Sequence, residues 1–148
     1  MGKIKILVDA DACPVKEIIV RLAKQKKVPI IMLIDTSHVL DDGYSQVITV
    51  DKGRDSADIR LVNLIQADDI VVTQDYGVAA MALAKKARVV HQNGMIYDNS
   101  NIDRLLFERA LGQEVRRAGG KSGKNKKRTK QDDAAFERIF SHMIEGNA

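Results

Sequence analysis

The sequence predicts an α/β fold, with an open, mostly parallel sheet flanked by helices. Two observations support this class. Five short apolar runs recur along the chain, and they are continuous rather than alternating, which is typical of strands buried on both faces of a parallel sheet. Segments with the apolar spacing of amphipathic helices separate most of these runs. Strands and helices that follow one another in this way build a layered sandwich.

The first half of the chain predicts three strands and one helix. The first strand, 4–8, reads IKILV and leads into a helix. Pro14 suits the first turn of that helix, and apolar residues at i, i+3, i+4 and i+7 follow within 15–22. The next two strands, 30–34 and 46–50, have no helical pattern between them, so the segment that joins them is predicted to be a loop.

The second half repeats the alternation of helix and strand. A helix is predicted over 55–66, because its apolar residues share one face. The strands 69–73 and 88–91 follow, and the apolar spacing within 76–87 predicts a helix between them. Two further amphipathic helices are predicted at 101–115 and 132–145.

The composition favours one globular domain with a separate basic segment. The chain has 148 residues, which suits a single core. Residues 1–115 form the α/β domain, 116–130 a basic flexible segment, and 131–148 a C-terminal helix that packs on the same domain. The basic segment carries eight Lys and Arg and no acidic residue, whereas the rest of the chain is slightly acidic.

Cysteine content and hydropathy predict a cytoplasmic protein. The single cysteine, Cys13, excludes an intramolecular disulfide framework and a cysteine-based zinc site, and we interpret it as a packing residue. No stretch approaches the ~18 apolar residues of a membrane span. The N-terminal apolar run leads straight into acidic residues, which is unlike a signal peptide.

Aspartates concentrate where the predicted strands end. Asp9 and Asp11 follow the first strand, and Asp75 follows the fourth. Ligands of open parallel sheets bind beyond the carboxyl ends of the strands, so these side chains are expected at the binding edge. By contrast, Asp68 and Asp69 precede a strand and are expected in a turn at the opposite edge.

The helix at 55–66 adds two further carboxylates. Asp58 shares the spacing of the apolar face, and Asp55 lies one turn earlier on the same side. Each of them also suits a simple N-terminal cap. Carboxylates gathered at one edge repel one another unless they take up protons or bind a cation, and oxygen ligands favour Mg²⁺ or Mn²⁺. We therefore predict that Asp9, Asp11, Asp55, Asp58 and Asp75 hold a divalent metal ion.

Four long motifs carry a resemblance to a known family. They read VDADACPV, GRDSADIRLVNL, VVTQDYGVAAMAL and NGMIYDNSNIDRLL, and the likeness covers almost the whole chain. The sequence resembles the uncharacterised bacterial YaiI/YqxD family, which is in turn similar to PIN-like nuclease domains. This resemblance implies a PIN-like three-layer sandwich and a Mg²⁺- or Mn²⁺-dependent ribonuclease, although the nuclease role is an analogy from the wider fold.

The resemblance also implies roles for individual residues. Asp9, Asp58 and Asp75 match the positions that hold the metal ion for RNA cleavage. Thr73 matches a threonine that supports the metal-bound carboxylates, and we assign Ser56 to the same supporting role. The chain departs from the family in its basic segment, where GKNKKRT replaces a Gly-Pro.

The basic segment is predicted to bind the RNA backbone. Its charges would give salt-dependent affinity without sequence preference, and it contains no aromatic residue for base stacking. The alternative interpretation is a solvated linker. The residues concerned are Arg116, Arg117, Lys121, Lys124, Lys126, Lys127, Arg128 and Lys130.

Two other functions remain open at the level of sequence. A phosphatase of the haloacid-dehalogenase type would use Asp9 as its nucleophile, Asp11 as its acid and Thr73 as its second motif, but no acidic pair follows that threonine after a later strand. A non-catalytic RNA-binding or regulatory module would use only 116–130. A dinucleotide enzyme is disfavoured, because no G-x-G-x-x-G follows a strand.

Overall fold

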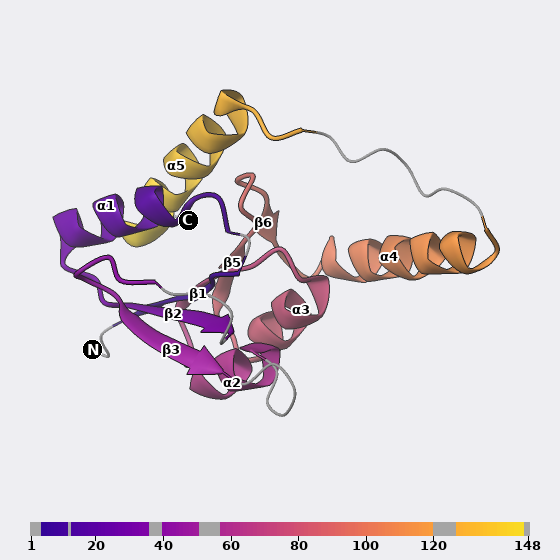
Figure 1. Ribbon diagram of the computed structural model, residues 1–148, viewed down its shortest axis with the longest axis horizontal. Coiled ribbons are helices and arrows are strands. Elements are labelled where there is room, and N and C mark those ends of the chain that lie inside the picture. The colour runs from indigo at the N-terminus through magenta and orange to yellow at the C-terminus, as the bar shows by residue number, and fades with distance from the viewer. Residues whose placement is uncertain (1–3, 12, 36–39, 51–56, 120–126, 147–148) are drawn as a thin grey trace.

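The computed structural model describes residues 4–11, 13–35, 40–50, 57–119 and 127–146, and it confirms the predicted fold class. These residues form one six-stranded sheet and five helices, with helices on both faces of the sheet (Figure 1). The strands are β1 (Ile6–Asp9), β2 (Ile30–Asp35), β3 (Gln46–Val50), β4 (Ile70–Val72), β5 (Arg88–Val90) and β6 (Ile96–Tyr97). The helices are α1 (Lys16–Lys26), α2 (Ala57–Leu64), α3 (Tyr76–Ala84), α4 (Ile102–Arg117) and α5 (Lys130–Ile144).

The strand order creates a switch point at the centre of the sheet. The order is β3-β2-β1-β4-β5-β6, and only β6 runs antiparallel to its neighbour. From β1 the chain first builds outward through β2 and β3, and it then returns to place β4 on the other side of β1. In open α/β sheets the crevice at such a point, beyond the carboxyl ends of the strands, is where ligands bind.

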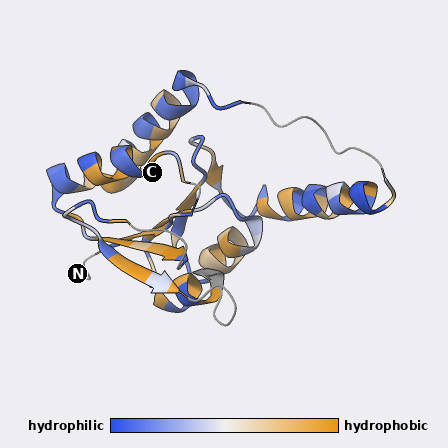
Figure 2. Ribbon diagram, in the orientation of Figure 1, coloured by the Kyte–Doolittle hydropathy of each residue, from blue (hydrophilic) through white to orange (hydrophobic). Residues whose placement is uncertain are grey.

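Alternation along the strands divides the core between two faces. Ile6 and Val8 of β1 pack in one cluster with α1 and α5, whereas Leu7 packs in a second cluster with α2, α3 and the start of α4. Successive side chains of a strand point to opposite faces, which explains the division. Figure 2 shows the matching pattern, with mostly apolar strands between helices that are hydrophilic on one side.

Helix α4 is held to this core only at its beginning. Ile102 and Leu105 are buried in the second cluster. Farther along the helix, Phe107, Leu111 and Val115 are exposed by 63%, 49% and 42%. The helix extends away from the sheet (Figure 1). Its far part is therefore stabilised by local interactions rather than by the core.

The structure differs from the sequence predictions at two elements, β6 and α4. Strand β6 was not predicted, because a pair of residues is too short to show a strand period. Helix α4 continues to Arg117, so Arg116 and Arg117 are helical and do not belong to the basic segment that we predicted to be flexible. Strand β3 runs parallel to β2, and the described residues between them, 40–45, contain no helix. The end of β3 therefore lies at the same edge as the ends of β1, β2 and β4.

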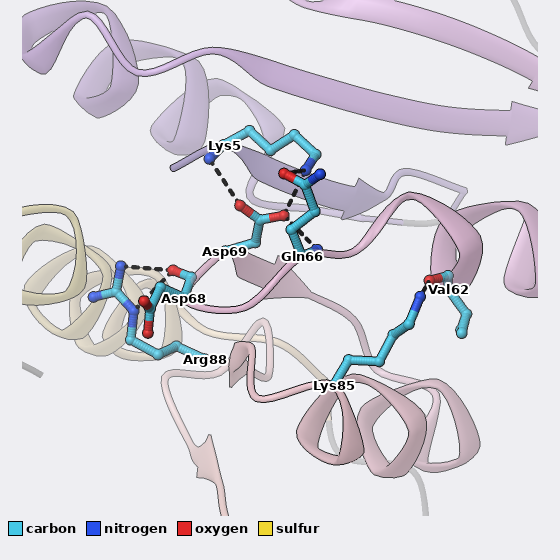
Figure 3. Close-up of polar contacts among 7 residues, drawn as sticks. All are labelled: Lys5, Val62, Gln66, Asp68, Asp69, Lys85 and Arg88. Atoms are coloured by element: carbon cyan, nitrogen blue, oxygen red, sulfur yellow. Dashed lines mark hydrogen bonds and ion pairs between the residues drawn. The ribbon is translucent and has the colours of Figure 1, made fainter. Parts of the chain in front are cut away.

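Asp69 is buried at the opposite edge of the sheet, where its carboxylate has several partners. Its carboxylate lies 2.6 Å from Lys5 Nζ and also accepts hydrogen bonds from the main-chain N–H groups of Lys5 and Gln66 (Figure 3). A buried carboxylate with these partners joins the start of β1 to the turn before β4. The prediction that Asp68 and Asp69 form a turn at this edge agrees with these contacts.

Candidate functional site at the carboxyl ends of β1 and β4

Asp9 and Thr73 meet at the switch point. Asp9 is the last residue of β1, and Thr73 directly follows β4 in the same register. The Thr73 hydroxyl donates to Asp9 Oδ2 at 3.3 Å. Since strand side chains alternate, both groups continue the row of Leu7 and Val71, on the face that α2, α3 and α4 cover. The sheet thus directs both polar groups toward the same side of its carboxyl edge.

Asp75 is tied to the same threonine and to a helix N-terminus. Its main-chain N–H donates to the Thr73 hydroxyl at 3.0 Å. Its Oδ1 caps α3 by accepting from the N–H groups of Gly77 at 2.8 Å and Val78 at 3.2 Å. A Cβ at position 77 would lie 3.2 Å from that oxygen, so the glycine leaves the carboxylate its place. Thr73 therefore links the Asp9 carboxylate at the end of β1 to the main chain of Asp75 after β4.

Tyr97 supports this link from β6. Its ring is buried, and its hydroxyl donates to the main-chain oxygen of Thr73 at 3.2 Å. The ring also packs edge-on against Tyr76, with 6.1 Å between centroids. Burial raises the pKa of the Tyr97 hydroxyl well above its ordinary value, which keeps the group a neutral donor. The short antiparallel strand thus positions the segment that carries Thr73 and Asp75.

Asp11 lies beside the end of β2. Its carboxylate accepts a hydrogen bond from the Asp35 N–H, with the closer oxygen at 3.2 Å. Because β2 is parallel to β1, this contact holds the loop after β1 against the end of its neighbour. The observed contact of Asp11 thus joins two strand ends at the candidate site.

Asp9, Asp11 and Asp75 line an open cavity of about 590 Å³. Its lining includes a cation that the sequence analysis did not identify, Arg109 of α4, whose Nη1 lies 3.5 Å from Asp75 Oδ1. The site therefore combines carboxylates from strand ends with one guanidinium from a helix. The lining residues are Asp9, Asp11, Gln74, Asp75, Tyr76 and Arg109.

Arg109 does have a signal in the sequence. Ile102, Leu105, Leu106 and Arg109 follow i, i+3, i+4, i+7 spacing, so the arginine is in line with the buried face of α4. The same spacing indicates Asp58 in the helix predicted over 55–66. Gln74 has no comparable signal, because it is an exposed residue in the turn between β4 and α3.

Part of the predicted metal site lies outside the side chains that the structure describes. Asp55 and Ser56 lie outside the described residues, and Asp58 lies in α2 but its side chain is not described. Among the side chains that are described, no group of three or more His, Cys, Asp or Glu is arranged to hold a metal ion.

The described donors nevertheless suit a hard cation. The acidic groups that line the cavity offer oxygen atoms only. Mg²⁺ retains several waters and is commonly held by one or two carboxylates, so Asp9 and Asp75 would suffice as protein ligands. Their common contact with Thr73 restrains both, which reduces the entropy lost when an ion binds.

Cys13 agrees with its interpretation as a packing residue. The thiol is buried in the core cluster that also contains residues of α1. Burial raises its pKa above the ordinary value of 9.0, which disfavours the reactive thiolate.

The basic residues of 116–130 are only partly described. Arg116, Arg117, Lys127 and Lys130 are exposed. Lys121, Lys124 and Lys126 lie outside the described residues. Arg128 is half-buried, and its guanidinium donates to the Asp133 carboxylate and to the main-chain oxygen of Gln92, each at 2.7 Å. The Arg128 guanidinium thus joins the start of α5 to the turn after β5.

Within the described part of the chain, no helix is both long enough and apolar enough to cross a membrane.

Comparison with known proteins identifies relatives over almost the full length. A UPF0178 protein of Ruminiclostridium cellulolyticum is 66% identical over 140 residues, which cover 95% of this chain and 92% of the relative. A UPF0178 protein of Alkaliphilus oremlandii is 54% identical, with 97% and 92% covered. A third, from Clostridium acetobutylicum, is 49% identical, with 95% and 96% covered.

No solved structure matches the chain. The profile described as "Uncharacterized BCR, YaiI/YqxD family" matches residues 7–146. That match and the relatives confirm the resemblance noted in the sequence motifs, and the chain therefore belongs to the YaiI/YqxD family.

Proposed function

We propose that this protein is a Mg²⁺- or Mn²⁺-dependent phosphodiesterase that cleaves RNA. The observation that carries the proposal is the contact of Asp9 and Asp75 with the same threonine, in a cavity at the switch point of the sheet. Oxygen ligands at this location suit a divalent cation and a phosphate substrate. RNA is favoured as the substrate by the likeness of the family to PIN-like nuclease domains and by the exposed basic residues near the end of α4.

The residues of the site divide into ligands and supports. Asp9 and Asp75 would bind the ion, and Asp11, Asp55 and Asp58 would complete or neighbour its shell. A bound divalent cation supplies Lewis acidity toward a phosphoryl oxygen and lowers the pKa of a bound water. Thr73 orients the Asp9 carboxylate through its hydroxyl and restrains Asp75 through the main chain. Capping of α3 fixes Oδ1 of Asp75, so a ligand would approach its other oxygen.

A calorimetric titration with Mn²⁺ tests the metal site directly. We expect the wild-type protein to bind Mn²⁺ and the Asp9→Asn variant to lose at least tenfold in affinity, because the variant removes a charged ligand. Asp68→Asn is a matched control: Asp68 is exposed at the opposite edge and has a left-handed backbone, with φ 72°, that asparagine also adopts. Equal binding by wild type and Asp9→Asn would refute the proposed site.

Cleavage of a labelled single-stranded RNA tests the reaction. Product should form with Mn²⁺ and wild-type protein, and it should vanish with a chelator or with Asp9→Asn. Phosphate retained covalently on Asp9 would instead indicate a phosphatase with an aspartyl nucleophile. RNA binding that withstands both the chelator and Asp9→Asn, without cleavage, would indicate a non-catalytic module.

A further inference from the structure

Among the described residues that line the candidate cavity, Arg109 carries the positive charge, and its contact with Asp75 is weak. Its Nη1 lies 3.5 Å from Asp75 Oδ1, the longest of the contacts that this oxygen makes. The other donors, the N–H groups of Gly77 and Val78, belong to the first turn of α3 and cannot leave without unwinding it. Hydrogen bonds weaken steeply toward such distances, so the guanidinium is the partner that yields first.

The surroundings of Arg109 allow it to move. Its side chain is 47% exposed, and that of Asp75 is 35% exposed. An ion pair open to water is weak, because solvent screens the attraction and both side chains lose rotamer freedom. The guanidinium can therefore leave Asp75 and remain at the cavity, since it is anchored through α4 by the buried Leu105 one turn earlier.

A metal ion and Arg109 would compete for the same carboxylate. Both are cations, and a divalent ion close to either oxygen of Asp75 would repel a guanidinium on Oδ1. The ion brings more charge than Arg109 and would displace it. A planar fork of N–H donors, left without its carboxylate partner, is well suited to a phosphate group.

We propose that Arg109 is the phosphate-binding residue of this cavity, and that it pairs with Asp75 until a divalent cation takes that carboxylate. This inference rests on the proposed function, since it assumes a metal ion on Asp75 and a phosphate-bearing ligand. It adds an order of events: the ion binds first, Arg109 is released, and the backbone phosphate of a single-stranded nucleic acid then binds. The metal-free protein would hold the same ligand without this contact.

Titration of the metal-free protein with Mn²⁺ tests the competition. We expect Arg109→Gln to bind Mn²⁺ about two- to fivefold more tightly than wild type, because the variant removes a competing cation from an exposed pair. Arg109→Lys should bind like wild type, since it retains the charge. Arg104→Gln is the matched control, because Arg104 lies on the same helix and pairs with Glu108 instead of Asp75.

Fluorescence anisotropy of a labelled single-stranded RNA, read before cleavage proceeds, tests the phosphate contact. Mn²⁺ should tighten binding to wild type more than to Arg109→Gln. The slope of log affinity against log salt, which is negative, should become shallower by about 0.7 for Arg109→Gln with Mn²⁺ present. It should not change without the ion, because one phosphate contact is lost only in the loaded state. A merely structural role for Arg109 would not depend on the ion.

The outcomes separate this inference from the proposed function. Wild-type protein that fails to bind Mn²⁺ overturns both. Wild-type protein that binds Mn²⁺, with an unchanged affinity in Arg109→Gln, overturns only the competition between Arg109 and the ion. An equal loss of RNA affinity with and without Mn²⁺ also overturns it, because Arg109 would then be a permanent contact.

Discussion

Thr73 connects the two halves of the candidate site. It is 2% exposed, and its single hydroxyl serves Asp75 as an acceptor and Asp9 as a donor. Its main-chain oxygen accepts from Tyr97, and its N–H donates to Val90. A valine has nearly the same shape but neither donates nor accepts a hydrogen bond, so substitution at this position separates the polar role from packing.

We expect Thr73→Val to lower the free energy of unfolding by about 1–3 kcal/mol, because the N–H of Asp75 loses its acceptor in a partly buried site. Urea denaturation measures this change. Thr73→Ser keeps the hydroxyl and loses only a methyl group, so it should be the milder variant. A larger loss for serine than for valine would show that packing, not hydrogen bonding, dominates at Thr73.

Sequence reasoning located the strand-end residues better than the helical ones. Asp9, Thr73 and Asp75 could be placed because the carboxyl ends of parallel strands share one edge. Arg109 was missed even though its spacing is informative, because a lone arginine on a helix is usually solvated. Its distance from Asp75 depends on the angle at which α4 leaves the sheet, and no local pattern encodes that angle.

Helix α4 changes character along its length. Leu105 is 6% exposed, whereas Phe107, half a turn later, is 63% exposed. The sequence predicted this helix correctly from its apolar spacing, but it could not tell where the helix leaves the core, because Phe107, Leu111 and Val115 are apolar as well. Contact with α3 and the rest of the second core cluster, which is non-local, decides which apolar side chains are buried.

Two substitutions on α4 should therefore differ strongly. We expect Leu105→Ala to cost about 2–4 kcal/mol of unfolding free energy, since it leaves a cavity in the second core cluster. Phe107→Ser should stay within about 0.5 kcal/mol of wild type, as exposed substitutions usually do. Urea denaturation of dilute protein measures both, and similar losses for the two variants would contradict the exposure of Phe107.

At the scale of the whole molecule, buried titratable groups should shape the dependence of stability on pH. Burial lowers the pKa of His91 below its ordinary value of 6.5 and raises the pKa of Cys13 above 9.0. It also raises the pKa of Tyr97 above 10.0. In each case the folded protein favours the neutral form.

The direction of the effect follows from proton binding. Below pH 6.5 the unfolded chain takes up a proton at His91 that the folded protein resists, so the free energy of unfolding should fall as the pH drops. Above pH 9.0 the unfolded chain releases the proton of Cys13, and above 10.0 that of Tyr97, so the free energy should fall as the pH rises. We expect a maximum between these limits.

Urea denaturation across this range measures the profile. Tyr97→Phe should flatten the loss above pH 10.0, because phenylalanine has no proton to release. His91→Gln should flatten the loss below pH 6.5 for the equivalent reason. If the free energy of unfolding still falls equally above pH 10.0 in Tyr97→Phe, groups other than Tyr97 cause that fall.

The placement of α5 has a consequence for the order in which the chain folds on the ribosome. Phe136, Phe140 and Met143 are fully buried against the face of the sheet that contains Ile6 and Val8 of β1. Helix α5 is synthesised after the six described strands, so the part of this face that α1 does not cover stays uncovered while the sheet can already pair. A nascent chain with all its strands made therefore still exposes a wide apolar surface, and release of the final helix removes that hazard of aggregation.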